Sequence, residues 1–225
     1  MSYVCRKRVK FCTVLNIDDS QNNSFLKFQK TTSYLNTRFI IVMGVAGCGK
    51  TSVGKSLAKH LGWDFYDADD FHTPENIAKM TNGIPLNDAD RSLWLASLHI
   101  LISSSLIQNR PSVLACSALK ESYRQQILAD NDGAQIVFLK GNYDLIWSRL
   151  SMRKDHYMKP QMLQSQFETL EEPTNALTVD IAKSVNDVVQ EILIIFFLES
   201  FLWRSDRLKY CCLYPESLQA SFTEI

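Results

Sequence analysis

A glycine-rich segment is the part of this sequence that most directly implies chemistry. The run Gly44-Val-Ala-Gly-Cys-Gly-Lys-Thr51 fits the pattern GxxxxGK[ST]. In such a loop successive backbone N–H groups turn toward bound phosphates, the lysine reaches the β- and γ-phosphates, and the Ser or Thr hydroxyl is a ligand for Mg²⁺. A chance Lys-Thr after a glycine-rich turn is the alternative, and the flanking pattern of strand and helix disfavours it. The residues expected to bind the triphosphate are Gly44, Val45, Ala46, Gly47, Cys48, Gly49, Lys50, Thr51 and Ser52, with Thr51 also at the metal.

A cluster of acids follows the phosphate-binding motif. GTPases, motor ATPases and small-molecule kinases share that motif, so other residues must decide the reaction. Asp67 and Asp69 are two positions apart and would point the same way in an extended segment. One carboxylate can then hold Mg²⁺ through water, while the other orients an attacking hydroxyl or takes its proton. Alternatively, these acids only favour the N-terminus of the following helix.

Two further polar groups lie between this cluster and the middle of the chain. His72 either donates a hydrogen bond to substrate hydroxyls or is a partly buried polar residue. Arg91 stands just inside the N-terminus of an expected helix, against the helix dipole, and therefore needs another partner. A ligand carboxylate would match its planar fork, and so would Asp88 or Asp90, which otherwise serve as helix cap and first-turn acid.

Basic side chains recur in the second half of the chain. Lys120 and Arg124 are spaced i,i+4 on an expected helix and either hold an anionic acceptor or form a solvated basic face. Arg149, Arg153 and His156 form a later basic run. This run either closes over the nucleotide or is ordinary surface charge on a helix.

The elements that must position these groups alternate along the chain. Short apolar runs predict buried strands, and longer periodic segments predict helices. Strands that alternate with helices indicate an α/β fold with a parallel sheet covered on both faces. The expected strands are 39–43, 64–67, 112–116, 135–139 and 177–181; the expected helices are 50–61, one capped by Thr73, 87–108, 118–129, one ending at Leu150, and one from Val185 onward.

Composition excludes several other classes of protein. The chain has 225 residues with 24 basic and 24 acidic side chains, so a net charge of zero argues against a nucleic-acid-binding protein. No run of 18 apolar residues predicts a membrane span. Six dispersed cysteines fit a reducing compartment, hence a cytoplasmic location. Basic residues between positions 6 and 10 leave mitochondrial targeting as an alternative, which Asp18 and Asp19 disfavour.

Three segments follow from these patterns. Residues 1–38 are polar without a sustained period and predict an N-terminal extension. Residues 39–198 contain every motif and predict one P-loop domain. Residues 199–225 form an atypical C-terminal tail, for which a weaker alternative is attachment to a membrane surface.

Taken together, the motifs resemble the gluconokinase family of small P-loop sugar-acid kinases. The resemblance covers about residues 39–195, and its distinctive blocks are PENIAKM with GIPLNDADR, CSALK with YR, and SQFETLEEP. It implies a three-layer P-loop kinase fold with a five-stranded parallel sheet, a helical acceptor-binding region and a lid, similar to shikimate and nucleoside-monophosphate kinases. It also implies transfer of the γ-phosphoryl group of ATP to D-gluconate with Mg²⁺, which supplies 6-phosphogluconate to the pentose phosphate pathway.

The resemblance also suggests roles for individual residues. Asp69 takes the place of the acceptor-orienting carboxylate, so that Lys50 and Asp69 are the expected catalytic residues, and Asp67 stands on the metal side. Gln166 lies in the SQF block with a polar role that the family pattern leaves undefined. The resemblance allows a homodimer, although no interface can be recognised. The expected acceptor-site residues are Asp69, His72, Arg91, Lys120 and Arg124, and the expected lid or adenine-side residues are Arg149 and Arg153.

Two other functions remain as alternatives. One is a P-loop kinase for another small acceptor, such as shikimate or a nucleotide. The other is a catalytically weak ATP-binding regulatory protein, against which the intact Lys50, Thr51, Asp67 and Asp69 argue.

Overall fold

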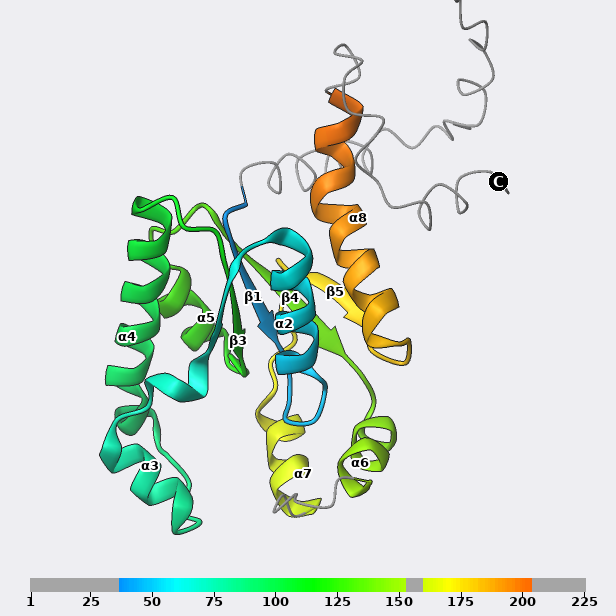
Figure 1. Ribbon diagram of the computed structural model, residues 1–225. Helices are drawn as coiled ribbons and strands as arrows, with labels where there is room; N and C mark the ends of the chain where they lie inside the picture. The colour runs from blue at the N-terminus through cyan, green and yellow to red at the C-terminus, as the bar shows by residue number, and fades with distance from the viewer. Residues whose placement is uncertain (1–36, 153–159, 204–225) are drawn as a thin grey trace, which may run out of the picture. The chain divides into compact units, whose positions relative to one another are not determined.

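A parallel β-sheet forms the centre of the protein. The computed structural model describes residues 37–152 and 160–203, and these contain one five-stranded sheet in the order β2-β3-β1-β4-β5 (Figure 1). Every neighbouring pair of strands is parallel. The three-layer α/β fold expected from the sequence is therefore confirmed. The strands are β1 (Phe39–Met43), β2 (Asp64–Asp67), β3 (Ser112–Cys116), β4 (Ala134–Lys140) and β5 (Leu177–Asp180).

Strand β1 lies at the middle of the sheet and is buried on both faces. Its five residues are fully buried, which explains why it reads as an uninterrupted apolar run rather than as an alternating one. Ile40 and Val42 join one core cluster, while Phe39, Ile41 and Met43 join the other. Because successive side chains of a strand point to opposite faces, this one segment anchors two hydrophobic cores.

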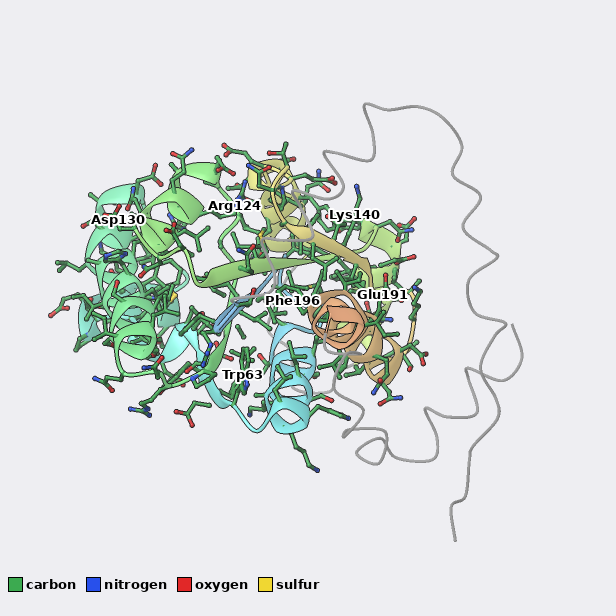
Figure 2. All side chains as sticks on the ribbon, turned by 90° about the horizontal axis from the view of Figure 1, so that it is seen from above. Trp63, Arg124, Asp130, Lys140, Glu191 and Phe196 are labelled. Atoms are coloured by element: carbon green, nitrogen blue, oxygen red, sulfur yellow. The ribbon has the colours of Figure 1, made fainter. Side chains whose placement is uncertain are left out.

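Helices cover both faces of the sheet. One face is covered by α2 (Lys50–Leu61), α6 (Tyr143–Ser151) and α8 (Val185–Trp203), and the other by α4 (Asp88–Ile107) and α5 (Glu121–Leu128). In Figure 2, Phe196 of α8 points toward the sheet, whereas Glu191 lies on the outer side of the same helix. Figure 1 shows α3 (Pro74–Thr81) and α7 (Pro160–Thr169) beyond the carboxyl ends of the strands, where ligands bind in open α/β sheets.

Two elements differ from the sequence-based expectation. Helix α5 begins at Glu121 rather than near residue 118, because Ala118 has φ of 42° and so cannot continue a right-handed helix. Helix α7 was not expected at all. Its ten residues are mostly polar, and only Leu163 and Phe167 mark an inward face, which is too weak a periodic signal to predict a helix.

The expected terminal segments lie largely outside the described residues. Residues 1–36 of the predicted N-terminal extension and residues 204–225 of the predicted tail are among the residues that the structure does not describe. Helix α8 runs through to Trp203, so the expected boundary between 198 and 199 falls inside a helix. Among the described helices, none is long and apolar enough to cross a membrane.

Candidate active site

The glycine-rich loop connects β1 to α2 at the carboxyl edge of the sheet. The nine residues expected at the phosphates, 44–52, form this loop and the first turn of α2. Gly49 is the N-cap residue with φ of 100°, it provides no side-chain cap, and the first turn contains no acid. The leading N–H groups of α2 therefore have no local anion to bind, which is the arrangement that favours a bound phosphate.

Close packing behind the loop keeps its curvature. Gly47 has φ of 83°, and a Cβ atom placed on it would lie 2.7 Å from the side chain of Leu150 on α6. Only glycine fits both this conformation and this contact. Cys48 is buried, and burial raises the pKa of its thiol, so it is a small core residue and not a reactive group.

Lys50 and Thr51 lie at the first turn of α2. The ammonium of Lys50 donates to the carbonyl of Val45 at 3.0 Å, so the side chain folds back along the loop. The hydroxyl of Thr51 donates to Oδ2 of Asp67 at 3.0 Å, which joins α2 to the end of β2. Two side-chain oxygens from separate elements thus lie side by side next to the glycine-rich loop.

The acidic cluster is not an extended segment, contrary to the sequence-based expectation. Asp67 ends β2, and Asp69 lies in the short 3₁₀ helix η1 (Ala68–Phe71). Oδ1 of Asp67 accepts a hydrogen bond from the backbone N–H of Asp69 at 3.3 Å. Asp67 therefore caps η1 and also bonds to Thr51, because the backbone turns directly after the strand.

Asp69 lies in an environment that disfavours its charge. Burial raises the pKa of this carboxyl above its ordinary value, the charge of Asp67 raises it further, and Lys50 and His72 oppose these effects. A carboxylate with a raised pKa accepts a proton more readily than an ordinary one. The role of acceptor-orienting base expected for Asp69 therefore stays a prediction, and the raised pKa of its carboxyl is in line with it.

His72 follows η1 and stacks on the indole of Trp94. The two ring centroids are 4.7 Å apart with an interplanar angle of 12°. Burial lowers the pKa of His72, so its neutral form is favoured. Its Nδ1 atom is buried and has no hydrogen-bond partner among the described residues. Trp94 also donates to the carbonyl of Ala68 at 2.7 Å, which fixes η1 against α4.

A pocket of about 440 Å³ opens beside Trp94, between the N-terminus of α4 and the turn after β3. This volume is in the range of ordinary small-molecule sites, about 300–1,000 Å³. The pocket lies next to η1, because Trp94 forms one wall and also contacts His72 and Ala68. Its polar lining includes Asn87, Asp88, Arg91, Lys120 and Tyr123.

Asp88 forms ion pairs with both cations of this pocket. Lys120 donates to both of its carboxylate oxygens at 2.9 Å, the Tyr123 hydroxyl donates to Oδ1, and Arg91 lies 3.8 Å away. The hydrogen bonds from Tyr123 and Lys120 hold the pKa of Asp88 below its ordinary value. Asp88 is not the helix cap that the sequence suggested, since Asn87 caps α4 in a reciprocal capping box with Asp90.

Arg124 does not share a helix face with Lys120, so this part of the expectation is wrong. Lys120 is the N-cap residue of α5 and is extended, whereas Arg124 lies inside the helix and is 2% exposed. Nη1 of Arg124 donates to the carbonyls of Ala118 and Leu119 at 2.9 and 3.0 Å. Its guanidinium therefore supports the turn that forms the pocket wall, and Arg124 is not among the residues that line the pocket.

The later basic run is only partly described. Arg149 of α6 donates to the carbonyl of Ile181 at 2.6 Å, which joins α6 to the loop that follows β5. Arg153 and His156 lie outside the described residues. The expected lid or adenine-side role of Arg149 and Arg153 therefore stays a prediction.

Comparison with known proteins decides the family. The shikimate kinase family model matches residues 46–194. A probable gluconokinase of Mus musculus is 42% identical over 174 residues, covering 68% of this chain and 95% of that protein. The chain belongs to the gluconokinase family. The thermoresistant gluconokinase of Escherichia coli (strain K12) is 43% identical over 153 residues, covering 66% of this chain and 87% of that protein.

A solved structure supports the same assignment. A gluconokinase from Sinorhizobium meliloti 1021 matches with a TM-score of 0.66 and 38% identity, covering 76% of this chain and 98% of that one. As a member of the gluconokinase family, the chain is an enzyme of the P-loop kinase type, with ATP as the phosphoryl donor. The expected family and class of enzyme are thereby confirmed.

Two pocket residues were not found by sequence reasoning. Asp88 was interpreted as a helix cap or as a partner of Arg91, from which it lies 3.8 Å, and Tyr123 was not singled out. The i,i+3 spacing of Lys120 and Tyr123 is the local signal that could have paired these two. Nothing local could have placed Asp88 beside them, because it is 35 residues from Tyr123 in the sequence.

Proposed function

We propose that the protein transfers the γ-phosphoryl group of ATP to the 6-hydroxyl of D-gluconate, giving 6-phospho-D-gluconate for the pentose phosphate pathway. Identity of about 40% to proteins named gluconokinase, over nearly their full length, supports this substrate. The observation that carries the proposal is the pocket beside η1. This pocket contains two cations, Arg91 and Lys120, that can bind the carboxylate of a ligand. It also contains the carboxylate of Asp88 and the phenol of Tyr123, which can hydrogen-bond to the hydroxyl groups of a ligand.

Acceptor binding follows from the charges of that pocket. Arg91 and Lys120 would hold the gluconate carboxylate, and Asp88 would accept hydrogen bonds from sugar hydroxyls. Asp88 already balances part of the positive charge, which lowers the attraction for small anions without hydroxyl groups. His72, whose neutral form is favoured, would bond a hydroxyl between this pocket and Asp69.

Phosphoryl transfer then requires two groups at the phosphate loop. Asp69 orients the 6-hydroxyl and takes its proton as the new O–P bond forms and the bond to the β,γ-bridging oxygen breaks. Lys50 stabilises the negative charge on the transferring group and on the leaving ADP. The raised pKa of Asp69 supports this role, since a stronger base takes the proton more readily.

The donor set at Thr51 and Asp67 fits Mg²⁺. Magnesium prefers oxygen ligands and is usually held by one or two protein groups together with phosphates and water. The Thr51 hydroxyl and the Asp67 carboxylate, 3.0 Å apart, provide such oxygens at the loop. Bound there, Mg²⁺ would neutralise charge on the β- and γ-phosphates.

An acceptor screen tests the proposal. Release of ADP is measured with Mg·ATP and gluconate, related sugar acids, shikimate or nucleoside monophosphates, with Lys50→Ala as the inactive control. The highest kcat/KM is expected for gluconate. A preference for shikimate or a nucleotide would contradict the substrate assignment. Nucleotide binding without turnover on any acceptor would instead indicate a regulatory protein.

We further propose that the reaction takes place in the cytoplasm. The dispersed cysteines support this location, and mitochondrial targeting is the alternative. Cell fractionation of the full chain, followed by gluconate-dependent ADP release in each fraction, distinguishes the two.

A further inference from the structure

One hydrogen bond joins the phosphate-binding loop to a helix far away in the sequence. The backbone N–H of Ala46 donates to Oε1 of Gln166 at 2.7 Å, across 120 residues. Ala46 is the third residue of the loop whose N–H groups face the phosphates in proteins of this type. The carboxamide of Gln166 is thus in direct contact with the phosphate-binding backbone.

The position of Gln166 on α7 makes this contact specific. Leu163 is fully buried in the core, and Phe167 packs against Tyr143 of α6 with ring centroids 5.6 Å apart. Gln166 lies on this inward side of α7 and is half-buried, while Gln164 and Glu168 are exposed and bond to each other at 3.0 Å. A polar group on an inward face is costly unless it is hydrogen-bonded, and Ala46 is its partner.

The chemistry of a carboxamide suits this position. Its oxygen accepts one bond, and its NH₂ group, on the same carbon, carries two donors. With the oxygen bound to Ala46, the NH₂ group is held next to the loop and adds no charge there. Donors that are already oriented before the reaction need no reorganisation when charge develops on the phosphates.

We propose that Gln166 is a positioning residue for phosphoryl transfer, which holds the Ala46 segment of the loop in its phosphate-binding conformation. This inference rests on the proposed function in one respect only, namely that gluconate is the acceptor in the kinetic assay. It assigns a role to the SQF block that neither the family resemblance nor the phosphate-binding motif defines. It also makes α7, an element outside the motif, part of the nucleotide site.

Three variants of the full-length chain test this role. Gln166→Ala removes the acceptor, Gln166→Glu keeps an acceptor but adds a negative charge beside the triphosphate, and Gln164→Ala is the matched control on the exposed side of α7. For Gln166→Ala we expect kcat to fall about 3- to 10-fold, the range of one hydrogen bond, with the KM for gluconate unchanged. For Gln166→Glu we expect a KM for ATP at least about tenfold higher, because like charges repel.

The outcomes separate positioning from a purely structural role. A purely structural bond would let Gln166→Ala lower the unfolding temperature while its kcat stays at the wild-type value wherever the variant is folded, and that result would overturn the proposal. Equal effects of Gln164→Ala, or a loss of kcat that only follows the loss of folded protein in thermal unfolding, would overturn it too. A fall in kcat of Gln166→Ala in fully folded protein, with no such fall in Gln164→Ala, supports it.

A binding measurement keeps this test independent of the acceptor. If the wild-type protein does not phosphorylate gluconate, the proposed function fails, but the affinity for a non-hydrolysable ATP analogue with Mg²⁺ can still be compared. Weaker affinity in Gln166→Ala than in Gln164→Ala then supports the role of Gln166. Equal affinities of these two variants overturn it.

Discussion

Replacement of Arg124 by methionine distinguishes two possible roles of this arginine, binding of the acceptor and support of the turn after β3. The sequence suggested that Arg124 binds an anionic acceptor, whereas the structure shows a guanidinium that is 2% exposed and bonded to its own turn. Arg124→Met keeps most of the length of the side chain and removes every donor. The carbonyl of Ala118, now 2.9 Å from Nη1, then loses its partner, whereas the carbonyl of Leu119 still accepts from the backbone N–H of Glu171 at 3.0 Å. Figure 2 shows Arg124 where α5 approaches the segment that precedes β5.

The expected loss of stability can be worked from these contacts. A buried acceptor left without a donor costs about 1–3 kcal/mol, and the Ala118 carbonyl is the one acceptor that loses its donor here. The ion pair with Glu121, at 2.6 Å, adds little, about 0.2–1 kcal/mol, because the Glu121 side chain is 51% exposed. For a domain of this size each kcal/mol lowers the unfolding temperature by about 2–4 °C. We therefore expect unfolding at a temperature lower by roughly 2–16 °C.

Thermal unfolding followed by circular dichroism measures this loss, with Gln126→Met on the exposed side of α5 as the control. Kinetics are then measured at a temperature where the variant is still folded. We expect the KM for ATP to stay near the wild-type value. If Arg124→Met unfolds like the control while its KM for gluconate alone rises tenfold or more, Arg124 binds the acceptor and the structural explanation is wrong.

Four further results are expected. Lys50→Ala should lower kcat at least about a hundredfold, because it removes a positive charge that stabilises the transferring phosphoryl group by on the order of 3 kcal/mol or more. A steady-state assay checks this, with thermal unfolding curves of both proteins to show that the variant is folded. Asp69→Asn should lower kcat by about 10²–10⁴ with little change in ATP affinity, as paired turnover and binding titrations would show. Asp67→Asn should instead raise the Mg²⁺ concentration needed for half-maximal turnover, measured by metal titration. Without nucleotide or Mg²⁺, Asp69→Asn should also unfold at a higher temperature than the wild type near pH 7, because the pKa of Asp69 is raised in the folded state and its ionised form opposes folding. This difference in unfolding temperature should disappear below about pH 4, where the carboxyl is protonated in both the folded and the unfolded state.

Much of the fold could be predicted because its signals are local. Burial on both faces makes β1 a continuous apolar run, and the change to a helical period after Gly49 predicts α2 with the bounds that the structure shows. Thr73 and Pro74 mark the start of α3 because cap and first-turn preferences depend on neighbouring residues. The phosphate-binding motif is equally local, since its loop and helix N-terminus are consecutive in the chain.

The sequence by itself therefore determined the class of fold, the phosphate-binding loop and the family. Only the tertiary structure decided which side chains meet: Asp88 with Tyr123 in the pocket beside Trp94, Arg124 with the turn after β3, and Gln166 with the loop. Each of these contacts consists of one or two hydrogen bonds, and many other residues along the chain carry donors and acceptors of the same kind. The choice among them depends on the order of strands in the sheet, which brings elements up to 120 residues apart to one edge. Local propensity carries no information about that order, and so the residues that complete the site became visible only when the elements were in place.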